Sequence, residues 1–142
     1  MKQIAVLGAG SWGTALALVL ARNGHSISLW GRNADIMDDI REHRINARYL
    51  PDHALPLAIT PRAKLNAAVK NADVVLIAAP STTFSSLCEA IAPLVNTKTP
   101  IVWATKGLAA GGHGLLHEVA QSALPGAPLA GLSGPSFAAE VA

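Results

Sequence analysis

Charge is scarce in this sequence of 142 residues, and the scarcity already excludes several classes of protein. Charged side chains make up 14% of the residues, whereas an average globular domain has about 25%. Hydrophobic residues make up 51%, so the chain is not intrinsically disordered. The formal net charge is only +2, which excludes a protein that holds nucleic acid mainly through a basic surface.

Cysteine occurs once, as Cys88, so the chain cannot form an internal disulfide. A single unpaired cysteine is typical of proteins from reducing compartments, and we expect a cytoplasmic protein. Clusters of cysteine and histidine are missing too. His113 and His117 have the spacing of two metal ligands, but Gly114 stands where a zinc peptidase carries glutamate, so we expect no metal site.

A hydrophobic run long enough to cross a membrane is also absent, although the segment from Ile4 to Ala21 carries no charge. Inside a helix, each glycine costs about 1 kcal/mol relative to alanine. Three glycines interrupt this segment: Gly8, Gly10 and Gly13. The segment is better explained as a strand over Gln3–Leu7, a glycine turn and a helix over Trp12–Asn23. We therefore expect neither a membrane span nor an export signal.

What the sequence does contain is an alternation of strand and helix signals. Apolar runs predict further strands over Ile27–Trp30, near Ile59, and over Asp73–Ala78, Ile101–Ala104 and Leu129–Leu132. Helices are predicted over Ala34–His43, Arg62–Val69, Thr83–Ala92 and Leu115–Ala123, with a final helix that begins at Pro135. A loop is expected around Pro51 and Pro56. This order predicts an α/β fold, a doubly wound and mostly parallel sheet of the Rossmann type, in one domain over residues 1–142.

The turn after the first strand has the pattern GxGxxG, written Gly8-Ala9-Gly10-Ser11-Trp12-Gly13. Between a strand and a helix, this pattern is typical of proteins that bind dinucleotides. Gly8 permits the tight turn, Gly10 lets the backbone approach a pyrophosphate, and Gly13 lets the helix pack on the strand. A tight turn that binds nothing is the alternative.

The end of the second strand selects between NAD and NADP, because an acidic residue there would bind the ribose 2′-hydroxyl of NAD. The sequence has Arg32 instead, whose guanidinium suits the 2′-phosphate of NADP. One charge-assisted hydrogen bond contributes roughly 1.5–3 kcal/mol, or about a ten- to hundredfold preference for NADP. NAD stays possible, because Asp35 is a rival acid and Arg32 could instead belong to the charge-rich, solvated surface between Arg32 and Arg48.

Ligands of open α/β sheets bind beyond the carboxyl ends of the strands, and the sequence places suggestive residues there. Lys106 is the only charge between Lys98 and Glu118, and its ammonium could hold a phosphate or polarise a carbonyl. Gly134 and Ser136 would lie at the start of the last helix, where N–H groups bind anions. An ordinary surface lysine and a plain helix cap are the alternatives.

Several blocks together resemble the bacterial type of NAD(P)-dependent glycerol-3-phosphate dehydrogenase, in that family's order and nearly from end to end. The blocks are Gly8–Ala15 (GAGSWGTA), Trp30-Gly31-Arg32, Asn46–Pro51 (NARYLP), Pro80-Ser81, Trp103–Gly107 (WATKG) and Leu132–Glu140 (LSGPSFAAE).

The resemblance implies hydride transfer between NAD(P)H and dihydroxyacetone phosphate or sn-glycerol 3-phosphate, in support of glycerophospholipid synthesis. It also implies a homodimer and assigns site residues. The cofactor would contact Ser11, Trp12, Arg32, Tyr49, Lys106 and Ala138, and the substrate would contact Lys106, Gly134 and Ser136. Lys106 is thereby the expected catalytic residue of this chain.

The family also has a second, helical domain, which carries the lysine proposed to transfer the proton. Because this chain ends at Ala142, we expect a fragment that binds NADPH weakly and turns over negligibly by itself. From Gly107 onward only Glu118 and Glu140 carry charge, so we expect the helical domain to pack on this flank. Two alternatives stay open: a non-catalytic nucleotide-sensing domain of the same fold, and a dehydrogenase for another substrate such as a hydroxy acid.

Overall fold

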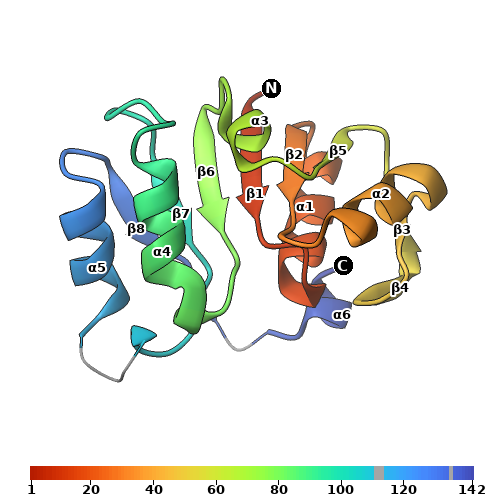
Figure 1. Ribbon diagram of the computed structural model, residues 1–142. Coiled ribbons are helices and arrows are strands. Elements are labelled where there is room, and N and C mark those ends of the chain that lie inside the picture. Colours follow the sequence, from red (N-terminus) through yellow and green to blue (C-terminus); the bar gives the residue numbers. More distant parts are fainter. Residues whose placement is uncertain (111–113, 135) are drawn as a thin grey trace.

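The computed structural model describes residues 1–110, 114–134 and 136–142, and within them six strands form one parallel sheet (Figure 1). Each neighbouring pair in this sheet runs parallel. In spatial order the strands are β5 (Ile59–Arg62), β2 (Ser26–Trp30), β1 (Gln3–Leu7), β6 (Val74–Ile77), β7 (Ile101–Trp103) and β8 (Leu129–Gly131). The predicted Rossmann-type sheet is therefore confirmed.

The strand order places a crevice at the middle of the sheet. From β1 the chain first builds outward through β2 and β5, and then returns to build β6, β7 and β8 on the other side of β1. The connections that leave β1 and β6 therefore diverge, and they open a crevice beyond the carboxyl ends of these two strands. A ligand of this fold binds at that reversal point.

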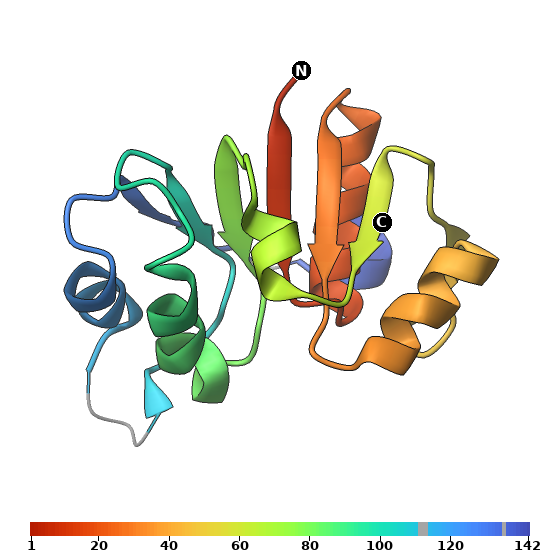
Figure 2. The same ribbon diagram turned by 45° about the horizontal axis from the view of Figure 1, so that its top comes forward.

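Helices cover both faces of the sheet, as Figures 1 and 2 show. Along β1, the side chains of Ile4 and Val6 belong to one core, and those of Ala5 and Leu7 belong to the other. The first core includes α1 (Ser11–Arg22), α2 (Ala34–His43) and α6 (Ala138–Val141), and the second includes α3 (Leu65–Val69), α4 (Ser81–Ile91) and α5 (Leu116–Ala123). Among the described helices, none has the length and apolar character that a membrane crossing requires.

The predicted loop around Pro51 is a two-stranded antiparallel ribbon instead, formed by β3 (Ile45–Asn46) and β4 (Leu50–Ala54). Proline is tolerated there because a strand at an edge does not need every N–H group for pairing. The side chain of Leu50 is buried in the same core as α1, which anchors the ribbon to the body of the protein.

Two predicted helix starts need correction. Arg62 ends β5 and does not begin a helix, and α3 starts at Leu65. The last helix was expected from Pro135, which lies outside the described residues. Ser136 and Phe137 are not helical, and α6 begins at Ala138, where the Glu140 carboxylate accepts a hydrogen bond from the Phe137 N–H at 3.4 Å. The expectation that Ser136 lies in a helical first turn is therefore wrong.

Candidate functional site

The glycine turn between β1 and α1 is packed so tightly that two of its glycines cannot be replaced without displacing backbone. Gly8 has φ of +126°, and a Cβ there would lie 2.5 Å from the carbonyl oxygen of Ala78 on the neighbouring segment. A Cβ at Gly13 would lie 1.8 Å from the carbonyl oxygen of Gly8. These contacts explain how the turn brings the start of α1 against the ends of β1 and β6.

Gly10 has the opposite environment, because a Cβ built there would meet no atom within 4 Å. The N–H groups of Gly10 and Ser11 donate to no other residue in the part of the chain that the structure describes. They lie at the N-terminus of α1, a helix of 12 residues, where the helix dipole favours negative charge. The turn therefore leaves an open approach to free donors, which suits an anion such as a pyrophosphate.

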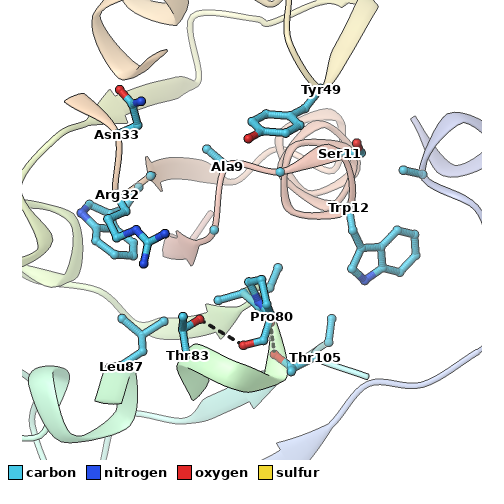
Figure 3. Close-up of a pocket in the computed structure, with 18 of the residues that line it drawn as sticks. Ala9, Ser11, Trp12, Arg32, Asn33, Tyr49, Pro80, Thr83, Leu87 and Thr105 are labelled. Carbon is cyan, nitrogen blue, oxygen red and sulfur yellow. Dashed lines mark hydrogen bonds between the residues drawn. The ribbon is translucent and has the colours of Figure 1, made fainter. Parts of the chain in front are cut away.

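A pocket of about 940 Å³ lies over this turn (Figure 3). Ala9, Ser11 and Trp12 line it from the turn and α1, Arg32 lines it from the end of β2, and Tyr49 lines it from the ribbon. Of the residues predicted from the sequence, those that line it are Gly8, Gly10, Ser11, Trp12, Arg32, Tyr49, Lys106, Ser136 and Ala138. Gly13 is buried below the turn, and Gly134 lines a second pocket.

Arg32 is exposed at the mouth of the larger pocket, and Figure 3 shows its guanidinium extending over the pocket toward Thr83. The rival acid Asp35 is in the first turn of α2 and does not line the pocket. Asn33 caps that helix, since its Oδ1 accepts a hydrogen bond from the Ile36 N–H at 3.2 Å. Asp35 is exposed on that helix.

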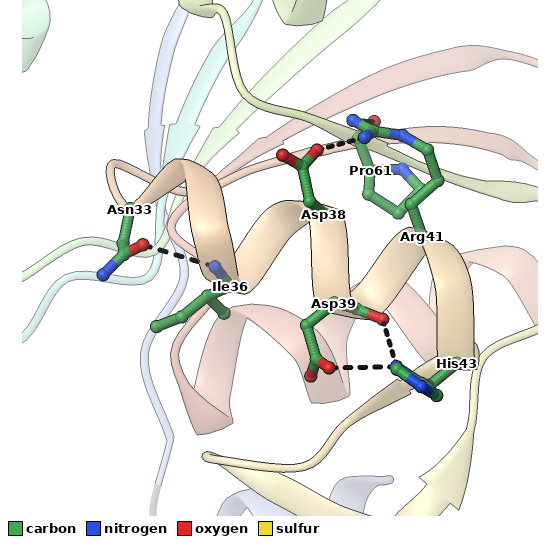
Figure 4. A network of polar contacts seen from close by, with 7 residues as sticks. All are labelled: Asn33, Ile36, Asp38, Asp39, Arg41, His43 and Pro61. Carbon is green, nitrogen blue, oxygen red and sulfur yellow. Dashed lines mark hydrogen bonds and ion pairs between the residues drawn. The ribbon is translucent and has the colours of Figure 1, made fainter.

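The charges that follow Arg32 in the sequence lie mostly on α2, where Asp38 and Asp39 each have a partner on the same helix (Figure 4). Arg41 bonds to the carboxylate of Asp38, one turn earlier, and Nδ1 of His43 lies 2.9 Å from Oδ1 of Asp39. All four side chains are about half exposed. Such pairs contribute little to stability, so this part of the charge cluster is a solvated helix face.

Lys106 lines both the larger pocket and a second pocket of about 460 Å³. Its ammonium lies 5.7 Å from the ring centroid of Trp12, within the range of a cation–π contact. The hydroxyl of Thr105 donates to the carbonyl oxygen of Ala79 at 2.8 Å, which ties the end of β7 to the end of β6. The second pocket is also lined by Trp103, Thr105, Gly107, Leu115, Leu116, His117, Gly131, Leu132, Ser133 and Gly134.

Asn46 is a site residue to which the sequence reasoning gave no role. Its fully buried side chain donates to the carbonyl oxygen of Ala9 at 2.9 Å and to the hydroxyl of Thr14 at 2.8 Å. Its place inside the block NARYLP was a sequence signal, but only the structure shows that this polar side chain is buried and has partners. The partners themselves lie too far away in the sequence to be predicted.

In the part of the chain that the structure describes, Cys88 is not a reactive nucleophile and no metal ligand set forms. Cys88 is fully buried, and burial, together with the nearby charge of Glu89, raises the pKa of its thiol to about 11. It is therefore a protonated core residue at neutral pH. In the described ranges no three His, Cys, Asp or Glu side chains gather as a metal site would require, and His113 lies outside those ranges.

Comparisons with known proteins agree with this geometry. Residues 3–142 match the family model described as NAD-dependent glycerol-3-phosphate dehydrogenase N-terminus. The glycerol-3-phosphate dehydrogenase [NAD(P)+] of Halorhodospira halophila is 52% identical over 139 residues, which are 97% of this chain and 41% of that protein. The chain thus spans about two fifths of this relative's length.

Solved structures give the same result. The crystal structure of glycerol-3-phosphate dehydrogenase from Coxiella burnetii superposes with a TM-score of 0.94 at 45% identity, over 99% of this chain and 43% of that one. Glycerol-3-phosphate dehydrogenase from Saccharomyces cerevisiae superposes with a TM-score of 0.86 at 26% identity, over 99% of this chain and 44% of the yeast chain.

Proposed function

This chain belongs to the glycerol-3-phosphate dehydrogenase family, and we propose that its larger pocket binds NADPH for a hydride transfer. The observation that carries the proposal is the glycine turn. Gly8 and Gly13 hold its backbone in close contact, while Gly10 leaves the approach to the start of α1 open. A pyrophosphate fits such a turn, because free N–H groups and the positive end of a helix dipole face it.

The other pocket residues fit the remaining parts of the same dinucleotide. Arg32 would pair with the 2′-phosphate, while Ser11, Tyr49 and Ala138 would contact the dinucleotide from other walls. The indole Nε1 of Trp12 is buried and has no hydrogen-bond partner among the described residues. When bound, the nicotinamide supplies the hydride. NADH is the second candidate, because the preference for NADPH rests on Arg32.

We propose dihydroxyacetone phosphate and sn-glycerol 3-phosphate as the substrate pair, in support of glycerophospholipid synthesis. Support comes from Lys106, which lines both pockets and can therefore face cofactor and substrate at once. Its ammonium would polarise the substrate carbonyl or hold the phosphate. Gly134 on the second pocket and Ser136 on the larger one would contact the substrate from the segment after β8.

The partners of this chain belong to the proposal as well. We propose that the flank after Lys106 packs against a helical substrate domain and that the enzyme acts as a cytoplasmic homodimer. Exposed apolar side chains support a packing surface there, since Leu132 is 47% exposed and Phe137 is 75% exposed. Apolar side chains of this size are usually covered when they gather on one flank.

Tryptophan fluorescence tests the proposed function directly, because Trp12 and Trp30 line the larger pocket and Trp103 lines the second one. NADPH should quench the emission in a saturable way, and NADH should do so with about ten- to hundredfold weaker affinity, if Arg32 makes one charge-assisted hydrogen bond. Absence of saturable quenching by either dinucleotide would refute dinucleotide binding. Tighter binding of NADH would refute only the role of Arg32.

A further inference from the structure

Asn46 connects the ribbon to the glycine turn through the interior of the protein. Its Nδ2 donates to the carbonyl oxygen of Ala9 at 2.9 Å and to the hydroxyl of Thr14 at 2.8 Å. Its Oδ1 accepts a hydrogen bond from the Tyr49 N–H at 3.3 Å. The amide thus uses both of its donor hydrogens and its acceptor. No part of the side chain is exposed, so these partners are fixed inside the structure.

The bond to Ala9 sets the direction of the next peptide group in the turn. In a trans peptide the C=O and N–H groups point in opposite directions, and the described residues contain no cis peptide bond. Because the carbonyl oxygen of Ala9 faces Asn46, the N–H of Gly10 faces away from Asn46. Gly10 itself lines the larger pocket. Asn46 therefore holds the peptide that would present a donor to the pyrophosphate.

The bond to Thr14 fixes the first turn of α1 relative to the same carbonyl group. The N–H of Thr14 donates to the carbonyl oxygen of Gly10 at 3.0 Å, so Thr14 is tied to the turn by its backbone as well. One amide thereby bridges the turn and the helix whose N-terminus would face the anion. A buried amide costs free energy unless all of its hydrogen bonds are made, whereas an apolar side chain would fill this space without that desolvation cost.

We infer that Asn46 is a positioning residue for dinucleotide binding, which holds the N–H groups of Gly10 and Ser11 in place for the pyrophosphate. The inference rests on the proposed function, because it assumes that the pyrophosphate binds at this turn. It predicts a loss confined to ligands that contain a pyrophosphate. Tyr49 keeps its place without the side chain of Asn46, since its N–H also donates to the backbone oxygen of Asn46 at 3.2 Å.

The test compares Asn46→Ala with Ser28→Ala in the full chain by calorimetric titration. Ser28 is a matched control, because it is 3% exposed and its hydroxyl accepts a hydrogen bond from Nε2 of Gln3 at 3.2 Å, outside the pocket. The ligands are NADPH and 2′-AMP, which has the adenosine and 2′-phosphate but no pyrophosphate. Asn46→Ala should raise the Kd of NADPH roughly tenfold and that of 2′-AMP less than about twofold, whereas Ser28→Ala should change neither.

Amide hydrogen exchange over residues 8–14 without ligand gives a second readout. Exchange should be faster in Asn46→Ala and unchanged in Ser28→Ala. If Asn46→Ala does not fold, Thr14→Val, which removes one acceptor, should weaken NADPH roughly threefold, and Thr14→Ser should bind as wild type does.

Unchanged exchange, unchanged NADPH affinity or an equal loss for both ligands would overturn the role of Asn46. A wild-type chain that does not bind NADPH would refute the proposed function instead, and the exchange measurement would still test whether Asn46 holds the turn.

Discussion

Alanine at Gly13 and alanine at Gly10 should separate stability from binding, because the structure requires the two glycines for different reasons. At Gly13 the added Cβ would lie 1.8 Å from the carbonyl oxygen of Gly8. Non-bonded carbon atoms pack at about 3.5–4.0 Å, so the turn or α1 would have to move by more than about 1.5 Å. Both are backbone and cannot move independently of the sheet, so the substitution strains the fold itself.

The expected cost at Gly13 is at least about 3 kcal/mol, at or above the upper end for overpacking a core. For a chain of this length, 1 kcal/mol corresponds to roughly 2–4 °C, so the Tm of Gly13→Ala should fall by about 6 °C or more. Loss of NADPH binding would accompany the distortion, because the turn between Gly8 and Gly13 forms the wall of the pocket.

At Gly10 the balance is different, because the added Cβ meets nothing within 4 Å. Its φ of −78° and ψ of −176° suit any residue. Alanine gains about 0.4–1 kcal/mol by restricting the unfolded chain, and it loses up to about 1 kcal/mol because it caps a helix less well than glycine. The Tm should therefore stay within about 4 °C of wild type. The methyl group, however, occupies the approach of the pyrophosphate, so the Kd of NADPH should rise at least about tenfold.

Thermal unfolding followed by circular dichroism, with NADPH titration of the same samples, measures both effects. Gly24→Ala is the matched control, because Gly24 has φ of +83° at the far end of α1 and lies outside the pocket. It should lower the Tm and leave the NADPH affinity unchanged. A Gly10→Ala protein with wild-type affinity, or a Gly13→Ala protein with wild-type Tm, would refute the reasoning.

Three further substitutions or conditions test other parts of the structure. Arg32→Asp should weaken NADPH about tenfold or more and NADH much less, and an equal loss for both in fluorescence titrations would contradict a 2′-phosphate contact. With a pKa near 11, the Cys88 thiol should react with thiol reagents only as the pH approaches that value or after unfolding. Because the folded-state pKa of this thiol is raised from 9.0, the protonated thiol contributes stability below pH 9, and this contribution is lost as the pH rises toward 11. The midpoint of urea unfolding should fall over this pH range. Cys88→Ala should abolish this pH dependence. Phe84→Ala removes a fully buried ring that packs edge-on against Trp103, with 6.0 Å between the two ring centroids. The substitution should lower the free energy of unfolding by about 3–5 kcal/mol in urea titrations.

Local sequence patterns were enough to predict most of the sheet. The run Val74–Ile77 is apolar throughout, and it forms a strand covered on both faces, as such a run predicts. The ribbon of β3 and β4 escaped prediction because Pro51, Asp52 and His53 follow no strand pattern. Tertiary contacts form it instead, among them the guanidinium of Arg44, which donates to the carbonyl oxygens of Leu55 at 3.3 Å and Ile59 at 2.8 Å.

The residues of the pocket also divide into those that local sequence predicts and those that depend on tertiary contacts. The three glycines were predictable because the need for glycine at each position arises from contacts within a few residues or with the neighbouring strand. Arg32 was predicted from its spacing in the sequence after these glycines. Asn46 could not receive a role in this way, because its hydrogen bonds to Ala9 of the turn and to Thr14 of α1 span 37 and 32 residues of sequence. Which buried amide meets which carbonyl depends on how the ribbon folds back over α1.

The contact between the Lys106 ammonium and the Trp12 ring has an optical consequence. A positive charge near an indole shifts the energy of its excited state, so the emission of Trp12 depends on where Lys106 lies. A phosphorylated compound that draws Lys106 into the second pocket would alter this emission even though it never touches the indole. In a chain whose Trp30 and Trp103 are replaced by phenylalanine, titration with glycerol 3-phosphate alone should then produce a spectral shift, and Lys106→Met should abolish it. One tryptophan would thus report on the occupancy of both pockets in a single cuvette.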